Sequence, residues 1–340
     1  MTNDADAPTS TPGPPPGSRG GWSPEQVGDQ SGRVVLVTGA NSGLGLETSA
    51  VLAAAGARVI MTARSREKGQ AALADVQGRA PGAQVELQML DLASLASVTD
   101  LATRLTATLG SHGLDLLVNN AGVMAVPKGR TQDGFEMQLG TNFLGHFALT
   151  GRLLGPLLQS ESAGRRPRVV SLSSMAHRFG RITPQDLMRE KRYEAWSAYG
   201  QSKLADLMFA LELDRRTERA GRELVSVAAH PGISATNLFT GGPFGRMPDV
   251  VRRAAGKVGE LVMQSPEQGA WSVLRAATAP DVVGGEYYGP AGAGERSGPP
   301  VRVGTSARAQ DVDMARWLWE EAVRLTGVGF HELDPPAGAA

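Results

Sequence analysis

The stretch that decides the fold is Arg33–Ala55, which reads RVVLVTGANSGLGLETSAVLAAA. Its apolar, mostly β-branched beginning, Val34–Val37, has the pattern of a parallel strand that is buried on both faces. Glycines interrupt the next residues, and the segment after them is rich in alanine and leucine, which favour a helix. A strand, a glycine-rich turn and a helix in this order predict the first unit of a parallel α/β sheet.

The glycines of this turn each have a separate use. Gly39 allows a sharp turn, Gly43 leaves room for a phosphate beside the backbone, and Gly45 lets the helix pack on the strand. The start of the helix presents unpaired N–H groups and a partial positive charge. An ordinary tight turn also uses glycine, but the strand before it and the helix after it favour a dinucleotide site.

The composition excludes several classes of function. The net charge is zero and the pI is near 7, so there is no electrostatic footprint for nucleic acid. There are no cysteines, which excludes disulfides, thiolate catalysis and cysteine-ligated metals, and we expect no metal site. The longest apolar stretch, Phe143–Leu158, is interrupted by His146 and Arg152, and a membrane helix needs about 20 apolar residues.

The N-terminus lacks the basic start and apolar run of a signal peptide. With no candidate membrane span, this predicts a cytoplasmic protein. Five lysines stand against twenty-nine arginines, and alanine and glycine are abundant, which is typical of a GC-rich bacterial gene.

Apolar segments of strand length alternate with segments of helical length along the chain. This alternation predicts an α/β fold: a Rossmann-type doubly wound parallel sheet of about seven strands, with helices on both faces, in a single domain over residues 32–327. Polar or glycine-rich residues follow the strands at the carboxyl edge, where such sheets bind ligands. The expected strands are 34–37, 57–63, 85–90, 114–118, 168–172, 224–229 and 285–289, and the expected helices include 94–109, 133–159, 197–220, 266–278 and 310–326.

The remaining segments have a different composition. Residues 1–31 are rich in proline, glycine, serine and threonine, and we expect a disordered tail whose Trp22 is either docked on the domain or exposed. A second tail is expected at 328–340 and a loop at 291–306. Residues 237–262 mix glycine and proline with short apolar clusters, and we interpret them as a substrate lid, with a surface loop of no role as the alternative.

Two residues on one predicted helix could transfer a proton. Tyr199 and Lys203 are four residues apart and therefore share a face. A tyrosine ionises near pH ~10, and a neighbouring ammonium favours the tyrosinate. Such a pair can protonate a carbonyl oxygen, or deprotonate an alcohol, while hydride moves at the carbon. Two unrelated polar residues on a surface helix would give the same pattern.

Ser174 and Asn142 are further candidates. Ser174 follows the expected strand 168–172 at the ligand edge, where its hydroxyl could bind a reacting oxygen or simply cap a turn. Asn142 is a polar residue in the apolar segment TNFLGHF, and is either functional or a satisfied core asparagine.

Together these motifs resemble the short-chain dehydrogenase/reductase family, over residues 33 to 326. They occur in the family's order, and the finer wording is similar to its retinol-dehydrogenase-like branch: NSGL at 41–44, Arg64 with EKG at 67–69, SSMAH at 173–177 and YGQSKL at 199–204. The motifs that carry the family resemblance are TGANSGLG at 38–45, NNAG at 119–122, Ser174, Tyr199-x-x-x-Lys203 and Pro231-Gly232.

The resemblance implies a catalytic tetrad. Tyr199 would be the acid/base, and Ser174 would orient the substrate oxygen. Lys203 would hold the nicotinamide ribose and lower the pKa of the tyrosine, and Asn142 would hold a water that joins the lysine to a proton relay. The small-molecule partner would be a carbonyl or alcohol compound.

The resemblance also implies the cofactor contacts. NAD-specific members place an acidic residue near position 63, whereas this chain has Ala63 followed by Arg64, which is placed to receive a 2′-phosphate. We therefore expect NADP(H) rather than NAD(H); a solvated arginine at the start of a helix is the alternative. The expected cofactor residues are Gly39, Asn41, Ser42, Gly43, Leu44, Gly45, Arg64, Asp91, Leu92, Asn119, Ala121, Gly122, Tyr199, Lys203, Pro231, Gly232, Ile233 and Thr236.

The interval between Ser174 and Tyr199 is 25 residues, longer than in compact members of the family, so the insert 178–198 is expected near the substrate mouth. The membrane-anchoring segment of many animal relatives is replaced by a polar tail. The family commonly pairs through its mid-chain helices, which permits a homo-oligomer here. The candidate lining residues suggest an apolar substrate, although most could equally be core: Met124, His146, His177, Phe179, Tyr193, Trp196, Leu238 and Phe239.

Two other functions are weighed against an oxidoreductase. A non-catalytic NADP-binding sensor of the same fold would be expected to have lost Tyr199 or Lys203, and both are present. A sugar-nucleotide epimerase or dehydratase of the extended branch would have a different glycine spacing and a larger C-terminal domain than remains after Gly232.

Overall fold

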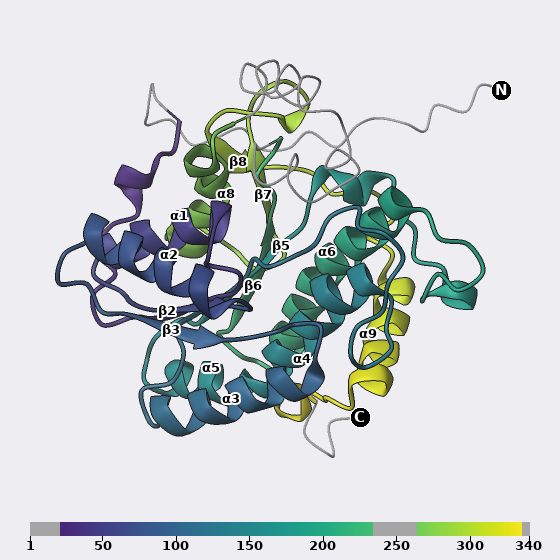
Figure 1. The fold of residues 1–340 in the computed structure, drawn as a ribbon, viewed down its shortest axis with the longest axis horizontal. Helices are drawn as coiled ribbons and strands as arrows, with labels where there is room; N and C mark the ends of the chain where they lie inside the picture. Colours follow the sequence, from purple (N-terminus) through teal and green to yellow (C-terminus); the bar gives the residue numbers. More distant parts are fainter. Residues whose placement is uncertain (1–20, 234–263, 335–340) are drawn as a thin grey trace.

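The computed structural model describes residues 21–233 and 264–334. Its centre is a single sheet in the order β3-β2-β1-β4-β5-β6-β7-β8 (Figure 1). Neighbouring strands are parallel except for the last pair, β7 and β8. The predicted fold class is confirmed. The strands are β1 (Val34–Val37), β2 (Arg58–Ala63), β3 (Val85–Met89), β4 (Leu116–Asn119), β5 (Arg168–Leu172), β6 (Val225–Ala229), β7 (Tyr287–Pro290) and β8 (Pro300–Arg302).

The eighth strand differs from the expected count of about seven. β8 lies inside residues 291–306, which the sequence predicts as loop. It has only three residues, begins with a proline and pairs antiparallel with β7 at the edge of the sheet. A proline is tolerated at the start of an edge strand. A segment this short shows no alternation of apolar and polar residues, so its sequence carries no strand signal.

The strand order reverses between β1 and β4, which both lie at the centre of the sheet and are fully buried. β1 pairs with β2 on one side, Val37 opposite Met61, and with β4 on the other, Val37 opposite Val118. The chain leaves β1 toward one face and β4 toward the other, which opens a crevice beyond their carboxyl ends.

Helices cover both faces of the sheet (Figure 1). On one face lie α1 (Gly43–Ala54), α2 (Arg66–Arg79) and α8 (Pro266–Thr278). On the other lie α3 (Leu95–Leu109), α4 (Gly145–Arg152), α5 (Leu154–Ser162) and α6 (Ala195–Arg219), with α9 (Val312–Thr326) packed outside α6. The short turns are η1 (Pro24–Gln26), η2 (Leu139–Leu144), η3 (Met175–Arg178), η4 (Pro184–Asp186), η6 (Ala293–Glu295) and η7 (His331–Leu333).

The prediction of a single helix at 133–159 is wrong. Residues 139–144 form a π-helical turn, η2, and α4 and α5 follow it as separate helices. The break falls at Leu153, three residues before Pro156. Proline has no N–H for the carbonyl of Arg152, and its ring would clash with that carbonyl in a continuous helix.

Parts of both expected tails pack on the domain. Within 21–31, Val27 and Gln30 are buried, and Trp22 packs against the core cluster under α1 and α8. At the other end, Val328 and Phe330 are buried. Apolar side chains inside both predicted tail ranges, 1–31 and 328–340, therefore find partners on the domain.

An aromatic cluster joins α4, α6 and α9. Trp319 of α9 lies with its ring centroid 5.1 Å from that of Phe147 in α4 and 5.8 Å from that of Phe209 in α6. Phe330 closes the cluster, with its centroid 4.5 Å from that of Trp319. Figure 1 shows α9 alongside α6 at the edge of this helix layer. The C-terminal helix thus covers an apolar face of the two helices beneath it.

Two expectations fall outside the described residues: the lid at 237–262 and the cofactor contact at Thr236. Among the helices that the structure describes, none is both long enough and apolar enough to pass through a bilayer.

Candidate active site

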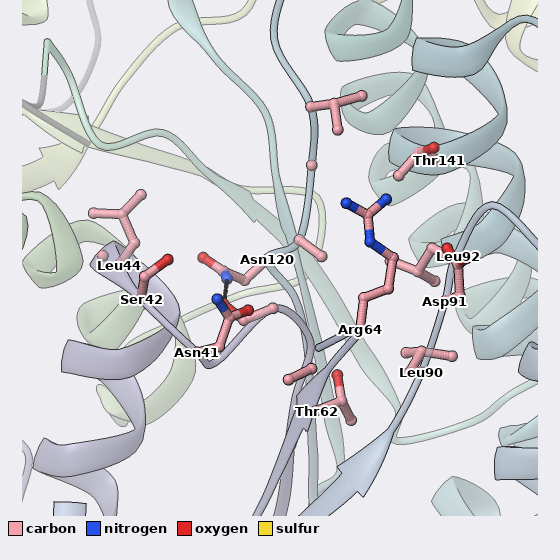
Figure 2. Close-up of a pocket in the computed structure, with 16 residues that line it drawn as sticks. Asn41, Ser42, Leu44, Thr62, Arg64, Leu90, Asp91, Leu92, Asn120 and Thr141 are labelled. Carbon is pink, nitrogen blue, oxygen red and sulfur yellow. Dashed lines mark hydrogen bonds between the residues drawn. The ribbon is translucent and has the colours of Figure 1, made fainter. Parts of the chain in front are cut away.

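A cavity of about 390 Å³ lies in the crevice beyond β1 and β4. Figure 2 shows its walls, with the glycine-rich turn on one side and the residues after β3 on the other. The structure brings many of the predicted cofactor residues to this cavity: Gly39, Asn41, Ser42, Gly43, Leu44, Arg64, Asp91, Leu92, Ala121 and Gly122. Thr62, Ala63, Leu90, Asn120, Val123 and Thr141 complete the lining.

The N-terminus of α1 opens into this cavity without a side-chain cap. Ser42 occupies the cap position, but its side chain accepts no backbone N–H. By contrast, α2, α3, α6, α8 and α9 each begin with a serine, glutamate or aspartate that accepts such a bond. The first-turn N–H groups of α1, with the positive end of the helix dipole, therefore suit a phosphate group. This observation fits a dinucleotide in the cavity.

Close backbone packing holds the glycine turn in place. Gly39 has a φ of +64°, and a Cβ there would lie 2.9 Å from the Cα of Ala121. A Cβ on Gly45 would lie 2.5 Å from the side-chain nitrogen of Asn120 and from the carbonyl oxygen of Gly39. Both positions therefore exclude any other residue for steric reasons. The two turns, after β1 and after β4, are packed into one wall.

Arg64 is the exposed cation of the cavity. Figure 2 shows its side chain extending from the end of β2 into the pocket. It forms no hydrogen bond or ion pair with any residue that the structure describes. The preceding residues that line the pocket, Thr62 and Ala63, carry no charge. The guanidinium is thus available for an anionic ligand.

Not every predicted cofactor residue lines the cavity. Asn119 is buried within β4, and its side-chain amide donates to the hydroxyl of Thr150, 3.0 Å away in α4. The next residue, Asn120, lines the cavity instead and donates to the carbonyl of Thr38 at 2.7 Å. The two asparagines alternate because successive side chains of a strand point to opposite faces.

The segment after β6 is built for a turn. Gly232 has a φ of +70°, and a Cβ there would lie 2.4 Å from the carbonyl oxygen of Arg296. The N–H of Ile233 donates to that same oxygen at 3.0 Å. Pro231, Gly232 and Ile233 therefore lie at the carboxyl end of β6, held against the turn before β8, and outside the residues that line the cavity.

The candidate acid/base pair lies near the start of α6. Glu194 caps this helix by accepting the N–H groups of Trp196 and Ser197. Tyr199 is half-buried, and its ring meets that of Trp196 edge to face, with the centroids 6.1 Å apart. Lys203 lies one turn later and is buried, with its ammonium donating to the carbonyl of Leu172 at 2.9 Å.

Lys203 has a second partner that none of the sequence motifs indicates. Its ammonium also donates to the carboxylate of Asp206, with 2.9 Å between Nζ and Oδ2. Burial acts to lower the pKa of Lys203, but the charge of Asp206, together with Tyr199 and the hydrogen bond, outweighs it, so the pKa is raised above its ordinary value. The spacing of three residues on a helix was the available signal.

Ser174 lies two residues after the end of β5, next to a residue that is hydrogen-bonded to α6. Its hydroxyl accepts the N–H of Ala176 at 3.2 Å, as a cap of η3. The adjacent Ser173 donates to the backbone carbonyl of Lys203 at 2.7 Å. Because Lys203 also binds Leu172, two hydrogen bonds fix α6 to the carboxyl end of β5. They set the position of the tyrosine and lysine relative to Ser174.

His177, a candidate for the substrate mouth, is buried. Its Nδ1 lies 2.7 Å from the carbonyl oxygen of Ser174, so the imidazole holds the backbone of the serine in place. Burial lowers the pKa of His177 and keeps it neutral.

Asn142 lies in the π-helical turn η2 and is completely buried. Its amide nitrogen donates to the carbonyl of Val123 and to the hydroxyl of Ser202, both at 2.9 Å, and its oxygen accepts the N–H of Val123 at 2.8 Å. A Cβ on Gly122 would lie 3.1 Å from the Asn142 oxygen and 3.6 Å from Nζ of Lys203. Asn142 therefore joins the cavity wall to α6. Single π-helical turns are frequent at functional sites.

The insert 178–198 contributes aromatic residues near Tyr199. Phe179 is 54% exposed and Trp196 is 37% exposed. Phe179 packs directly on the backbone of Gly200, where a Cβ would lie 2.6 Å from its ring. Tyr193 has another use, because its hydroxyl donates to the carbonyl of Val126 at 2.6 Å. Phe179 and Trp196 thus place exposed apolar surface near the start of α6, close to Tyr199.

Comparisons with known proteins give the family. A family model described as short chain dehydrogenase matches residues 33–241. The chain is 41% identical over 318 residues to polyprenol dehydrogenase from Mus musculus, covering 93% of this chain and 90% of that protein. It is 38% identical over 306 residues to retinol dehydrogenase 13 from Homo sapiens, covering 87% and 85% respectively.

Solved structures of similar proteins agree with the family found by the sequence comparisons. The crystal structure of an uncharacterized protein from Mycobacterium paratuberculosis has a TM-score of 0.74 and 41% sequence identity, covering 91% of this chain and 99% of that one. The NADP active-site complex of Pseudomonas aeruginosa RhlG has a TM-score of 0.58 and 26% identity, covering 76% and 94%. The family match supports an oxidoreductase that acts on carbonyl or alcohol groups with a nicotinamide dinucleotide. The chain belongs to the short-chain dehydrogenase/reductase family, in its retinol-dehydrogenase-like branch.

Proposed function

We propose that this protein is an NADP(H)-dependent oxidoreductase that interconverts a carbonyl and an alcohol on an apolar small molecule. The observation that carries the cofactor preference is Arg64, an exposed guanidinium in the cavity with no partner among the described residues. A 2′-phosphate would give it a charge-assisted contact, whereas NAD-specific sites use a carboxylate there.

The cavity residues would hold the dinucleotide by its phosphates and ribose. The first turn of α1 would bind the pyrophosphate, and Asp91 and Leu92 would lie beside the adenine. Lys203 would bind the nicotinamide ribose, since Gly122 of the cavity wall lies beside its ammonium. The bound nicotinamide would supply or accept the hydride.

The proton would move at Tyr199. In reduction its hydroxyl would give a proton to the carbonyl oxygen, and in oxidation the tyrosinate would take one from the alcohol. Ser174 would hydrogen-bond the reacting oxygen. Asn142 would fix the cavity wall at Val123 to α6 at Ser202, beside Lys203. Tyr199 and Lys203 come from α6, Ser174 from the segment after β5 and Asn142 from η2.

Two exposed aromatic residues near Tyr199 support an apolar substrate. Trp196 exposes an apolar ring beside that of Tyr199, and Phe179 exposes another against the backbone of the next residue, Gly200. Two relatives carry the names polyprenol dehydrogenase and retinol dehydrogenase 13, and polyprenols and retinol are apolar alcohols. A polar sugar or organic acid would find no partner on these rings.

A screen of aldehydes, ketones and secondary alcohols, following NADPH absorbance, tests the function. Tyr199→Phe should lower kcat by about 10²–10⁴-fold while NADPH affinity changes little. Tyr288→Phe is the matched control, since Tyr288 lies in β7 and packs in the core cluster under α1 and α8. A Tyr199→Phe variant with more than about a tenth of wild-type kcat contradicts the acid/base role. A wild type that binds NADPH but turns over none of the carbonyls would favour a sensor.

A further inference from the structure

α6 carries a buried carboxylate that the proposed mechanism does not use. The side chains of Lys203 and Asp206 are only 7% and 8% exposed, and Nζ lies 2.9 Å from Oδ2. Lys203 is the only side chain that Asp206 binds within the described part of the chain. A buried carboxylate is costly unless it is paired, and this one has its single ion pair on the lysine beside Tyr199.

The three N–H groups of the Lys203 ammonium have distinct directions. One donates to the carbonyl of Leu172 and one to Asp206. The third has no partner among the described residues, and Gly122 lies beside Nζ, where an added Cβ would be 3.6 Å away. Because two N–H groups of the ammonium are held by Leu172 and Asp206, the third can donate to a ligand in the cavity. Asp206 therefore orients the lysine as well as neutralising it.

The charge beside Tyr199 depends on this pair, because the other titratable groups nearby are neutral or already paired. On α4, burial lowers the pKa of His146 to about 3, and on η3 it lowers that of His177. On β7, burial raises the pKa of Tyr287. At the surface Arg178 pairs with Glu295, and at the N-terminal cap of α6 Glu194 accepts two backbone N–H groups.

We propose that Asp206 is a positioning residue that anchors the Lys203 ammonium and offsets its charge, so that Tyr199 remains a proton donor up to a higher pH than Lys203 alone would allow. A lone ammonium favours the tyrosinate, and a carboxylate on its far side reduces that effect. This inference rests on the proposed function, in which Tyr199 is the acid/base group.

The test is a spectroscopic titration of the protein without cofactor. The chain has four tyrosines, and the absorbance step that disappears in Tyr199→Phe belongs to Tyr199. In the other three, burial is the main cause that raises the pKa above the ordinary value of tyrosine. In Asp206→Asn the Tyr199 step should move about one pH unit lower, because the amide keeps the hydrogen bond and removes the charge. The pH profile of carbonyl reduction should move in the same direction.

Asp214→Asn is the matched control. Asp214 lies on the same helix, but it accepts the N–H of Ser226 in β6 and lies against Gly284, away from Lys203. It should leave the Tyr199 step unmoved. If Asp206→Asn does not fold, Asp206→Ser removes the same charge and gives the same readout. If the Tyr199 absorbance step stays at the wild-type pH in Asp206→Asn or Asp206→Ser, the inference is overturned. The proposed function fails separately, if Tyr199→Phe remains active.

Discussion

The imidazole Nε2 of His146 lies 2.8 Å from the hydroxyl oxygen of Thr38, and this contact joins the helix layer to the turn after β1. The other ring nitrogen, Nδ1, lies 2.6 Å from the carbonyl oxygen of Asn142. The Thr38 hydroxyl also accepts the N–H groups of Asn120 and Ala121. One buried histidine therefore connects the cavity wall to the π-helical turn that carries Asn142.

This histidine should make the protein sensitive to acid. Burial lowers the pKa of His146 to about 3, whereas an unfolded histidine titrates near ~6.5. Since the folded value is the lower one, its contribution to stability is complete above pH ~6.5 and is lost as the pH falls, by up to about 1.4 kcal/mol per pH unit. In His146→Asn this slope should become shallower in urea unfolding between pH ~6.5 and ~4.

His331→Asn serves as the control for that series, because the side chain of His331 is 88% exposed. It should keep the wild-type slope. Equal slopes in His146→Asn and wild type would show that His146 gains its proton without unfolding.

Arg64 should decide the cofactor. Arg64→Asp removes the partner of a 2′-phosphate and adds a charge that repels it. Charged hydrogen bonds contribute about 1.5–3 kcal/mol, so the ratio of kcat/KM for NADPH to that for NADH should fall roughly 10- to 150-fold. Arg66→Asp, two residues later in α2 and outside the cavity lining, should change the ratio little. A wild type that already prefers NADH would refute the assignment.

The two asparagines after β4 should behave differently. Asn120→Ala removes the bond to the Thr38 carbonyl that holds the glycine turn, and we expect NADPH affinity to fall about 5- to 10-fold, as for the loss of one hydrogen bond. Asn119→Ala loses only the contact with Thr150, so the melting temperature should fall while NADPH affinity stays near wild type. Isothermal titration of the two variants separates these roles, and the reverse pattern would place Asn119 in the cofactor site.

Asp214→Asn should stabilise the protein at neutral pH. Burial raises the pKa of Asp214 to about 6, above the value near ~3.9 of an unfolded aspartate. The stability it contributes is therefore present below pH ~3.9 and lost as the pH rises toward 6. The amide avoids this loss, and after allowance for partial exposure we expect about 1 kcal/mol at pH ~7.5 and no gain at pH ~4. A gain of equal size at both pH values would point to a cause other than ionisation.

The sequence predicts most of the central sheet because buried parallel strands are continuous apolar runs with polar ends. Val34–Val37 and Arg168–Leu172 stand out in this way, and both are strands in the structure. Pro300–Arg302 does not stand out, since an edge strand of three residues gains its identity from its neighbour β7 rather than from its own side chains. The break at Leu153 was readable from Pro156, although helical periodicity runs through it.

The candidate site was predicted where a motif specifies a backbone shape, and missed where a side chain acts through another. Gly39 and Arg64 line the cavity as their positions in the sequence suggest. Asp206 belongs to none of the motifs, and Thr38 appears only as the first residue of TGANSGLG, with no role of its own. Their importance lies in contacts with Lys203 and His146, and only the fold brings Thr38 to His146.

The aromatic cluster around Trp319 has a consequence for synthesis on the ribosome. Phe147 and Phe209 belong to helices that are made before α9, whereas Trp319 and Phe330, which cover them, are made more than 100 residues later. Domains begin to fold from the N-terminus during translation, so the nascent chain carries an uncovered aromatic face until α9 and Phe330 have emerged. A stop codon before α9 would leave that face permanently open to chaperones and to other unfinished chains.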